Sequence, residues 1–308
     1  MNNRVNFSFG LLCVVLVITV MAGCRRENAE TAPPYDDDSP AVTVAVVNYP
    51  LAYFVERIAG NKVRILFPVP QDCDPAFWKP TDDQIQQYQQ ADLILLNGAG
   101  YAKWIKTSSL PESKVVNTSK AFSDKYLQNK HGVTHSHGPQ GADTHGAVDF
   151  NIWLDPLQAL QQAESVRDAL IRLMPQSEVS LPAGYISLSN DLKDLDKRLR
   201  EFTDRIGSQP IMASHPVYNY LSRRYKWNLK SVHWEPGEMP SDHEWQRFAE
   251  ILKTHPAKIM IWEADPAPEV AEKVHALGLR CLTFNPCGNR PAVGDYLSVM
   301  RDNTDDKR

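Results

Sequence analysis

The sequence predicts an α/β protein with two lobes, each a mostly parallel sheet flanked by helices, joined by one long helix. Three observations support this fold class. Short apolar runs rich in β-branched residues alternate with segments of helical periodicity, which is typical of parallel sheets covered by helices. The alternation occurs twice along the chain. Between the two series lies an unbroken apolar stripe at helical spacing.

The first 23 residues are expected to be an export signal that takes no part in the fold. Arg4 lies in a short polar start, residues 11–20 form an apolar run, and small residues follow. The run ends in Met21-Ala-Gly-Cys24, which resembles the bacterial lipobox, whose cysteine is lipidated and becomes the new N-terminus. We therefore expect a lipoprotein signal peptide over 1–23 and lipidation at Cys24. The alternative is an ordinary signal peptide with an incidental cysteine.

Residues 24–40 are polar, charged and contain proline, and they offer nothing to bury. Such a composition predicts a flexible tether between the lipid and the folded protein. No other apolar run approaches the roughly 20 residues that span a bilayer, so a polytopic membrane protein is excluded. With 33 Lys and Arg against 37 Asp and Glu, the 308-residue chain has a formal net charge of −4. A nucleic-acid binder would show a basic surplus.

The N-terminal lobe is expected over residues 41–175. Its strands are predicted at 42–47, 63–67, 93–96 and, from a weaker pattern, 114–117. Its helices are predicted at 51–59, 82–90, 101–108 and 155–174. Because strands and helices alternate, the strands should lie parallel with helices on both faces of the sheet.

The connecting segment, residues 176–207, contains the clearest helix. Its apolar residues are spaced three and four apart: Tyr185, Leu188, Leu192, Leu195, Leu199, Phe202 and Ile206. Gly207 is expected to end the helix. A helix from about Ser180 to Ile206 would be roughly 40 Å long, and such a rigid connector should allow little hinge motion between the lobes.

The C-terminal lobe is expected over residues 208–308. Its strands are predicted at 210–213, 230–233, 258–262 and 280–284. Its helices are predicted at 217–225, 242–254, 268–277 and 291–301. Ligands of open α/β sheets bind beyond the carboxyl ends of the strands. The sequence therefore predicts a binding site in the cleft between the lobes.

Six stretches of the sequence form a specific pattern when they are taken in order. They are residues 49–60, 74–81, 91–100, 151–156, 214–225 and 294–301. Together they resemble the metal-binding solute receptors of bacterial zinc and manganese ABC transporters, from Val44 to about Asn303. The resemblance implies the two-lobe fold and an extracytoplasmic, lipid-anchored receptor. Such a receptor captures a divalent metal, zinc in preference to manganese, and presents it to an ABC permease and its ATPase.

The resemblance also implies four metal-ligand positions, and here they read Ala76, Asn151, His215 and Asn285. Only His215 matches the family pattern. Zinc sites use three or four imidazole, thiolate or carboxylate donors, whereas alanine offers none and amide oxygens carry no charge. His215, Asn151 and Asn285 therefore form a weak candidate set in the cleft, and either altered or lost specificity would explain it.

Neighbouring groups offer several ways to compensate: Cys73, Asp74, Asp149, Glu263 and Cys287. A set of Cys73, His215 and Cys287 would favour Zn²⁺ or Cu⁺. A disulfide or separate buried thiols are the favoured alternatives, and the redox state of Cys73, Cys281 and Cys287 stays open. Glu235-Pro-Gly-Glu238 is expected to form a turn at the edge of the cleft.

A histidine-rich segment over residues 131–145 holds four of the nine histidines: His131, His135, His137 and His145. It is rich in glycine and has no periodicity, which predicts a mobile loop. Short tracts of this kind bind transition metals weakly and reversibly. We expect this loop to hold most of the zinc, with His215 as a minor or transfer site. The alternative is a solvated loop whose histidines are incidental.

Two other classes of function compete with the receptor. One is a divergent family member without cleft metal binding, which recognises another ligand or acts in surface adhesion. The other is a metal-dependent hydrolase, but the sequence has no His-Glu-x-x-His motif and no nucleophile elbow. We therefore expect a monomeric binding protein of the bacterial cell envelope rather than an enzyme.

Overall fold

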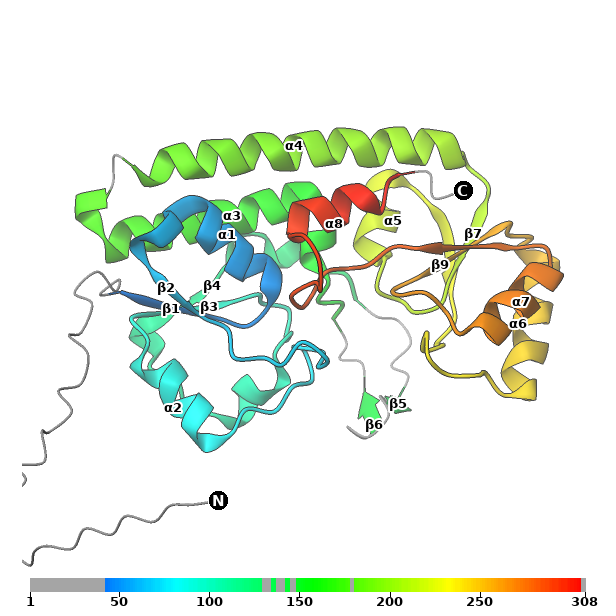
Figure 1. Cartoon of the computed structure of the whole chain (residues 1–308), viewed down its shortest axis with the longest axis horizontal. Coiled ribbons are helices and arrows are strands. Elements are labelled where there is room, and N and C mark those ends of the chain that lie inside the picture. Colours follow the sequence, from blue (N-terminus) through cyan, green and yellow to red (C-terminus); the bar gives the residue numbers. More distant parts are fainter. Residues whose placement is uncertain (1–41, 129–133, 137–141, 145–147, 178–179, 306–308) are drawn as a thin grey trace, which may run out of the picture. The chain divides into compact units, whose positions relative to one another are not determined.

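The computed structural model (Figure 1) describes residues 42–128, 134–136, 142–144, 148–177 and 180–305. The expected signal peptide, tether and Cys24 lie outside these residues. Across the described ranges, no helix is both long and apolar enough to cross a membrane.

The first lobe is built on a four-stranded parallel sheet. Its strands are β1 (Thr43–Val46), β2 (Arg64–Leu66), β3 (Leu93–Leu96) and β4 (Val115–Asn117). They lie in the order β2-β1-β3-β4, and every neighbouring pair is parallel. The apolar residues of β1 and β3 are buried at the centre of this sheet, so the predicted parallel sheet is confirmed.

The second lobe repeats this arrangement. Its strands are β7 (Pro210–Ala213), β8 (Asn228–Ser231), β9 (Ile259–Trp262) and β10 (Arg280–Thr283). The order β10-β9-β7-β8 is that of the first sheet read from the opposite edge, and all pairs are parallel. The prediction of a strand at 230–233 was wrong by two residues. Asn228 pairs with Pro210, so β8 begins earlier and His233 lies beyond its end.

Helices cover both sheets (Figure 1). They are α1 (Tyr49–Ala59), α2 (Asp82–Gln90), α3 (Pro156–Leu173), α5 (Asn219–Tyr225), α6 (Asp242–Thr254), α7 (Pro268–Ala276) and α8 (Tyr296–Asp302). Short 3-10 helices lie at Gly60–Lys62, Lys103–Thr107, Glu112–Lys114, Lys120–Lys125, Ile152–Leu154 and Pro175–Ser177.

Two predicted helices differ from those observed. The segment 101–108 contains only the 3-10 helix Lys103–Thr107, which Ser108 ends in extended conformation. The helix predicted at 291–301 begins at Tyr296, because Gly294 has a φ of +80° and the Asp295 carboxylate accepts a hydrogen bond from the Ser298 amide as the helix cap. Residues 291–295 therefore form a bent loop that leads into α8.

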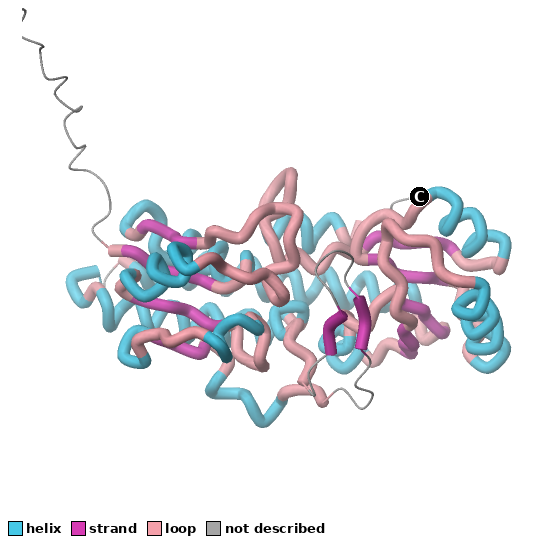
Figure 2. The backbone as a smooth tube through the Cα atoms, turned by 90° about the horizontal axis from the view of Figure 1, so that it is seen from below, coloured by secondary structure: helices cyan, strands magenta, loops and turns pink. Residues whose placement is uncertain are grey.

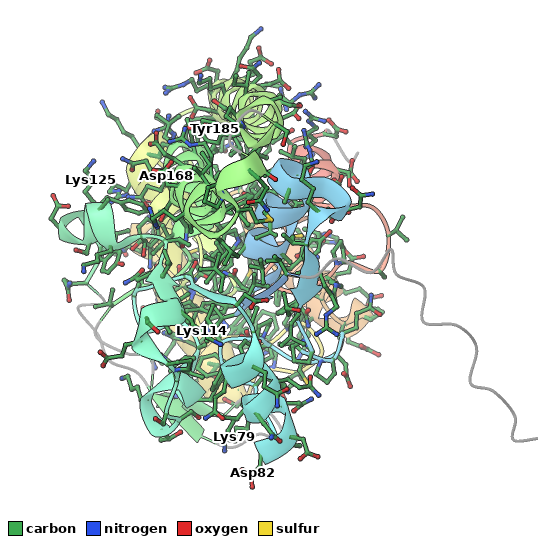
Figure 3. The ribbon with its side chains drawn as sticks, turned by 90° about the vertical axis from the view of Figure 1, so that its left-hand side faces the viewer. Lys79, Asp82, Lys114, Lys125, Asp168 and Tyr185 are labelled. Carbon is green, nitrogen blue, oxygen red and sulfur yellow. The ribbon has the colours of Figure 1, made fainter. Side chains whose placement is uncertain are left out.

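The predicted long helix is α4 (Leu181–Ile206), which runs along both lobes in Figure 1. The apolar stripe from Leu188 to Ile206 is buried against the rest of the protein. Figure 3 shows α4 lying over α3, with Tyr185 of α4 and Asp168 of α3 labelled on the two helices. The Arg167 guanidinium stacks over the Tyr185 ring at 4.3 Å from its centroid. Gly207, with a φ of +66°, ends the helix as expected.

A second connection returns from the second lobe to the first after β10. The Pro286 carbonyl accepts a hydrogen bond from the Trp153 indole at 2.7 Å, and the Gly288 carbonyl accepts one from the Tyr49 amide at 3.0 Å. The Asn289 amide nitrogen donates to the carbonyls of Pro70 and Cys73 at 2.6 and 2.8 Å. Residues 286–289, which we call the crossover, are thus fastened to the first lobe by hydrogen bonds.

The chain that follows the crossover is anchored on α1 and on the long helix α4. α8 packs against α1 and α4. Asp191 of α4 accepts hydrogen bonds from Arg57 of α1 at 2.6 Å and from Arg301 of α8 at 3.1 Å. The lobes are therefore joined by two separate connections, α4 and the crossover, where the sequence analysis identified only the helix.

We expect Gly184→Ala to destabilise the protein, although an alanine normally stabilises a helix by about 1 kcal/mol relative to glycine. A methyl group at Gly184 would lie 2.6 Å from the carbonyl oxygens of Arg57 and Ile58, because α4 crosses the end of α1 closely there. To relieve this clash the backbone must shift, which lowers the free energy of unfolding by about 1–3 kcal/mol.

Urea unfolding of both variants measures this effect. Gly237→Ala is the matched control, because its added methyl meets nothing within 4 Å and its free energy of unfolding should change little. A stabilised Gly184→Ala variant would contradict the close approach of the two helices.

Candidate functional site

The carboxyl ends of the strands border a cleft of about 450 Å³ between the lobes. The first lobe lines it with residues 71–75, Phe77, Tyr101, residues 149–151 and Trp153. The second lobe lines it with residues 215–217, Glu235, Glu263, Ala264, Asn285, Pro286, Gly288 and Asn289. The site lies where the strand polarity predicted it, and it brings together Asn151, His215 and Asn285 from the predicted set.

His215 follows β7 and is 3% exposed. Its Nδ1 lies 3.5 Å from Oε1 of Glu235 and 3.5 Å from Oε1 of Glu263. Its ring meets that of His233 edge to face, with the centroids 5.5 Å apart. Glu235 follows β8 and Glu263 follows β9, so one edge of the parallel sheet gathers an imidazole and two carboxylates.

Asn151 is held by a buried carboxylate. Its backbone N–H and its side-chain amide both donate to Oδ1 of Asp149, at 2.9 and 3.3 Å. Oδ2 of Asp149 accepts a hydrogen bond from the Asn219 amide at 3.0 Å. Burial raises the pKa of Asp149 to about 6 although these donors lower it. The carboxylate at this place in the cleft therefore belongs to Asp149, and Asn151 serves as its donor.

Asn285 has a structural role that the sequence did not reveal. Its side-chain oxygen accepts a hydrogen bond from the Cys287 backbone N–H at 2.7 Å, across a tight turn in which Cys287 has a φ of +56°. Its backbone exchanges two hydrogen bonds with the Asn303 side chain. The amide oxygen that a metal would need is therefore engaged in starting the crossover.

Ala76 contributes nothing to the cleft. It is fully buried, its N–H donates to Oδ1 of Asp74 at 2.8 Å, and its carbonyl accepts from the Lys103 N–H. The first lobe instead brings Asp72 and Asp74 to the cleft wall. Sequence reasoning missed Asp72 and the positioning residue Asn219, for which no motif gave a signal.

The cleft is strongly acidic. Asp72, Asp74, Asp149, Glu235 and Glu263 line it, whereas its described lining contains no Lys or Arg. Carboxylates that are gathered in a concave site concentrate the negative potential and attract cations. Glu235 and Glu263 both follow strands of the second sheet. The sequence analysis had named Glu263 as a possible compensating group and had placed Glu235 in a turn at the edge of the cleft.

The soft site considered for Cys73, His215 and Cys287 does not form. Cys73, Cys281 and Cys287 are thiols in the structure. Cys73 lines the cleft, whereas Cys287 is buried at 2% exposure outside its lining. As the side chains stand, no three His, Cys, Asp or Glu residues in the described part of the chain form a group that could hold a metal ion.

The histidine-rich segment contains regular structure that the sequence analysis did not predict. Strands β5 (Thr134–Ser136) and β6 (Ala142–Thr144) pair antiparallel, with His135 opposite Asp143, apart from both larger sheets (Figures 1 and 2). The expectation of a loop without regular structure was therefore wrong for these residues, because the polar strands pair with each other. His131, His137 and His145 lie outside the described residues.

Comparison with known proteins identifies relatives over nearly the whole folded chain. The model of the family described as zinc-uptake complex component A, periplasmic (ZnuA), matches residues 44–306. The high-affinity zinc uptake system protein ZnuA of Bacillus subtilis strain 168 is 23% identical over an alignment of 309 positions, which covers 96% of this chain and 95% of that protein. The zinc-binding lipoprotein AdcA of Streptococcus pneumoniae R6 is 23% identical, and the match covers 85% of this chain but 54% of AdcA.

Solved structures confirm the fold. The metal-dependent lipoprotein YcdH of Bacillus subtilis superposes with a TM-score of 0.72 at 20% identity, covering 85% of this chain and 96% of that one. The Zn(II)-bound ZnuA-like domain of Streptococcus pneumoniae AdcA gives a TM-score of 0.71 at 19% identity, with the same coverage. At these identities the likeness establishes the two-lobe fold alone.

We expect the cleft and core cysteines to differ in reactivity. Burial, with a smaller contribution from Asp295, raises the pKa of Cys287 to about 12, and only a thiolate reacts readily with iodoacetamide. At pH 8 the native protein should therefore be alkylated at Cys73 long before Cys287, and both should react after unfolding. Peptide mass spectrometry measures this order. A linked Cys73–Cys287 peptide from unreduced protein would instead support the disulfide alternative.

Proposed function

We propose, from the premise that the chain belongs to the family of periplasmic zinc-uptake components, that it is the lipid-anchored, monomeric receptor of an ABC transporter. In this role it binds a divalent metal ion outside the cytoplasm and delivers it to a permease and its ATPase. The family consists of solute-binding receptors and not of enzymes.

The acidic cleft is the observation that carries this proposal. Five carboxylates and the buried His215 line one cavity, and its described lining contains no lysine or arginine. An anion would be repelled from such a site, and an uncharged solute would gain nothing from its negative potential. A small cation of high charge satisfies them best. Zinc is the first choice, because ZnuA and AdcA are described as zinc proteins.

The histidine-rich segment supplies a second place for the metal. We place most of the bound zinc on His131, His135, His137 and His145, and a minor or transfer site at His215. A flexible ligand set loses entropy when it is ordered, so each histidine site should be weaker than a preorganised cleft of three histidines. The β5–β6 hairpin pairs only with itself, so its removal should leave both larger sheets intact.

A divergent receptor without cleft metal binding is the second candidate. Ala76 offers no donor, and the Asn285 oxygen is engaged by the Cys287 N–H. Such a protein would recognise another ligand through the acidic cleft or act in surface adhesion. Metal titration separates the two candidates.

The zinc titration compares the parent protein, a variant lacking residues 131–145, and His215→Ala. The deletion should remove most of the bound zinc measured by elemental analysis and calorimetry, and His215→Ala should remove a smaller share. If the deletion leaves stoichiometry and affinity intact while His215→Ala abolishes binding, the proposed division between loop and cleft is wrong. If the parent binds no divalent ion, the metal receptor itself is refuted.

The lipid anchor is tested separately. Mass spectrometry of the membrane fraction should show a diacylglyceryl group on Cys24 as the first residue of the mature chain, because small residues precede this cysteine at the end of a short apolar run. Cys24→Ser should shift the protein out of the membrane fraction. A mature wild-type chain that begins elsewhere and is soluble would contradict lipidation.

A further inference from the structure

We infer that the cleft holds its metal ion on His215, Glu235 and Glu263, three side chains of the second lobe, and not on the set that family resemblance implies. This inference rests on the proposed function, since it names the ligands of the same cleft. It also narrows the class of cargo, because the nature of the donors determines which ions bind.

The topology of the second sheet brings these three residues together. His215, Glu235 and Glu263 follow β7, β8 and β9, which are adjacent parallel strands and therefore end at one edge. Backbone hydrogen bonds continue beyond the strands. The Ser214 N–H donates to the Ile261 carbonyl and the Trp234 N–H to the Ser214 carbonyl, and the Trp262 carbonyl accepts from the Phe284 N–H. The backbone next to each of the three residues is thereby held in place.

Two of the three separations within this set are compatible with ligands of one metal ion. Nitrogen and oxygen ligands lie about 2.1 Å from zinc, so two ligands of a tetrahedral ion are about 3.4 Å apart. His215 Nδ1 lies 3.5 Å from Oε1 of Glu235 and 3.5 Å from Oε1 of Glu263. Both pairs are therefore longer than a good hydrogen bond and have the length of a tetrahedral edge.

The three side chains are not yet a complete ligand group, as the absence of any ready metal group from the described residues shows. Their exposure indicates which of them would move. The His215 side chain is 4% exposed and held by packing, whereas those of Glu235 and Glu263 are 31% and 27% exposed. Rotation of the glutamates towards a fixed imidazole completes the group without any movement of the backbone.

The positions that the family resemblance implies contribute less to a metal site. Asn151 donates to Asp149, Asn285 accepts from the Cys287 N–H, and Ala76 has no donor atom. The carboxylates of the first lobe lie across the cleft, where they attract cations. One lobe thus carries the ligands, and the opposite wall adds negative potential.

This donor set predicts the class of ion. One imidazole and two carboxylates carry two negative charges and are harder than a set of three imidazoles, so they suit Mn²⁺ better than imidazole-rich sites do. The cleft should still prefer Zn²⁺ to Mn²⁺, but by a smaller factor than a three-histidine site would. The expected cargo is a first-row divalent ion that is held with relaxed selectivity.

The test uses the purified protein with His131, His135, His137 and His145 replaced by glutamine, which keeps the length of the chain and removes the competing imidazoles. Calorimetric titrations with Zn²⁺ and Mn²⁺ are then compared for this loop-substituted parent and for three variants made in it: His215→Ala, Glu235→Gln and Glu263→Gln. Asp72→Asn is the matched control, because it removes the same charge from an exposed position in the same cleft. Circular dichroism melts without metal verify that each variant is folded.

We expect each glutamine variant to weaken binding of both ions at least about tenfold, the lower range for loss of a group that supports a metal ligand. Asp72→Asn should change binding less than about threefold, since it alters only the screened long-range potential. X-ray absorption of the zinc-loaded parent should show an imidazole with oxygen donors and no sulfur at about 2.3 Å.

Three outcomes would overturn the inference. If the loop-substituted parent binds and His215→Ala loses binding while both glutamine variants match the parent, the cleft receptor stands but its ligands are others. If Asp72→Asn weakens binding as much as the glutamine variants do, the glutamates act through charge alone. If the loop-substituted parent binds neither ion, the cleft site does not exist. Failure of the wild-type protein to bind either ion would refute the proposed function as well.

Discussion

The parallel arrangement of the strands is the constraint on which the rest of this structure depends. Because all strands of a sheet run the same way, each lobe has one edge at which every strand ends. Residues that are far apart in the sequence must therefore meet there. α4 and the crossover hold the two edges on opposite sides of one cleft, so that the chemistry of the molecule is concentrated in the residues that follow its strands.

Burying a carboxylate in the cleft is unfavourable, and hydrogen bonds from neighbouring residues offset part of this free energy. Asp149 is buried, and burial alone disfavours its charged form. Three hydrogen bonds, from the Asn151 backbone, the Asn151 amide and the Asn219 amide, stabilise that form. Because Asn219 belongs to the second lobe, this carboxylate also links the two walls of the cleft. Asn151 is thus a positioning residue for a neighbouring acid.

The sequence could predict which apolar residues are buried, whereas it could not predict the hydrogen-bond partners of particular polar atoms. The β-branched run at 42–47 and the stripe from Leu188 to Ile206 indicated their elements because apolar spacing determines which face is buried. The role of Asn285 depends on one hydrogen bond within a turn, which composition does not reveal. The approach of Glu235 and Glu263 to His215 depends on the register of three strands, so the sequence could indicate that both glutamates lie near the cleft but not that they meet one imidazole.

The two connections between the lobes determine how this receptor can respond to its ligand. Hinged receptors gain affinity by closing one domain on the other, but here α4 spans both lobes and Asn289 fastens the crossover to the Pro70 and Cys73 carbonyls. Domain closure would have to break these hydrogen bonds. Rotation of half-buried glutamates beside a fixed imidazole breaks none of them. Recognition by local movement of side chains is therefore the response that this framework permits.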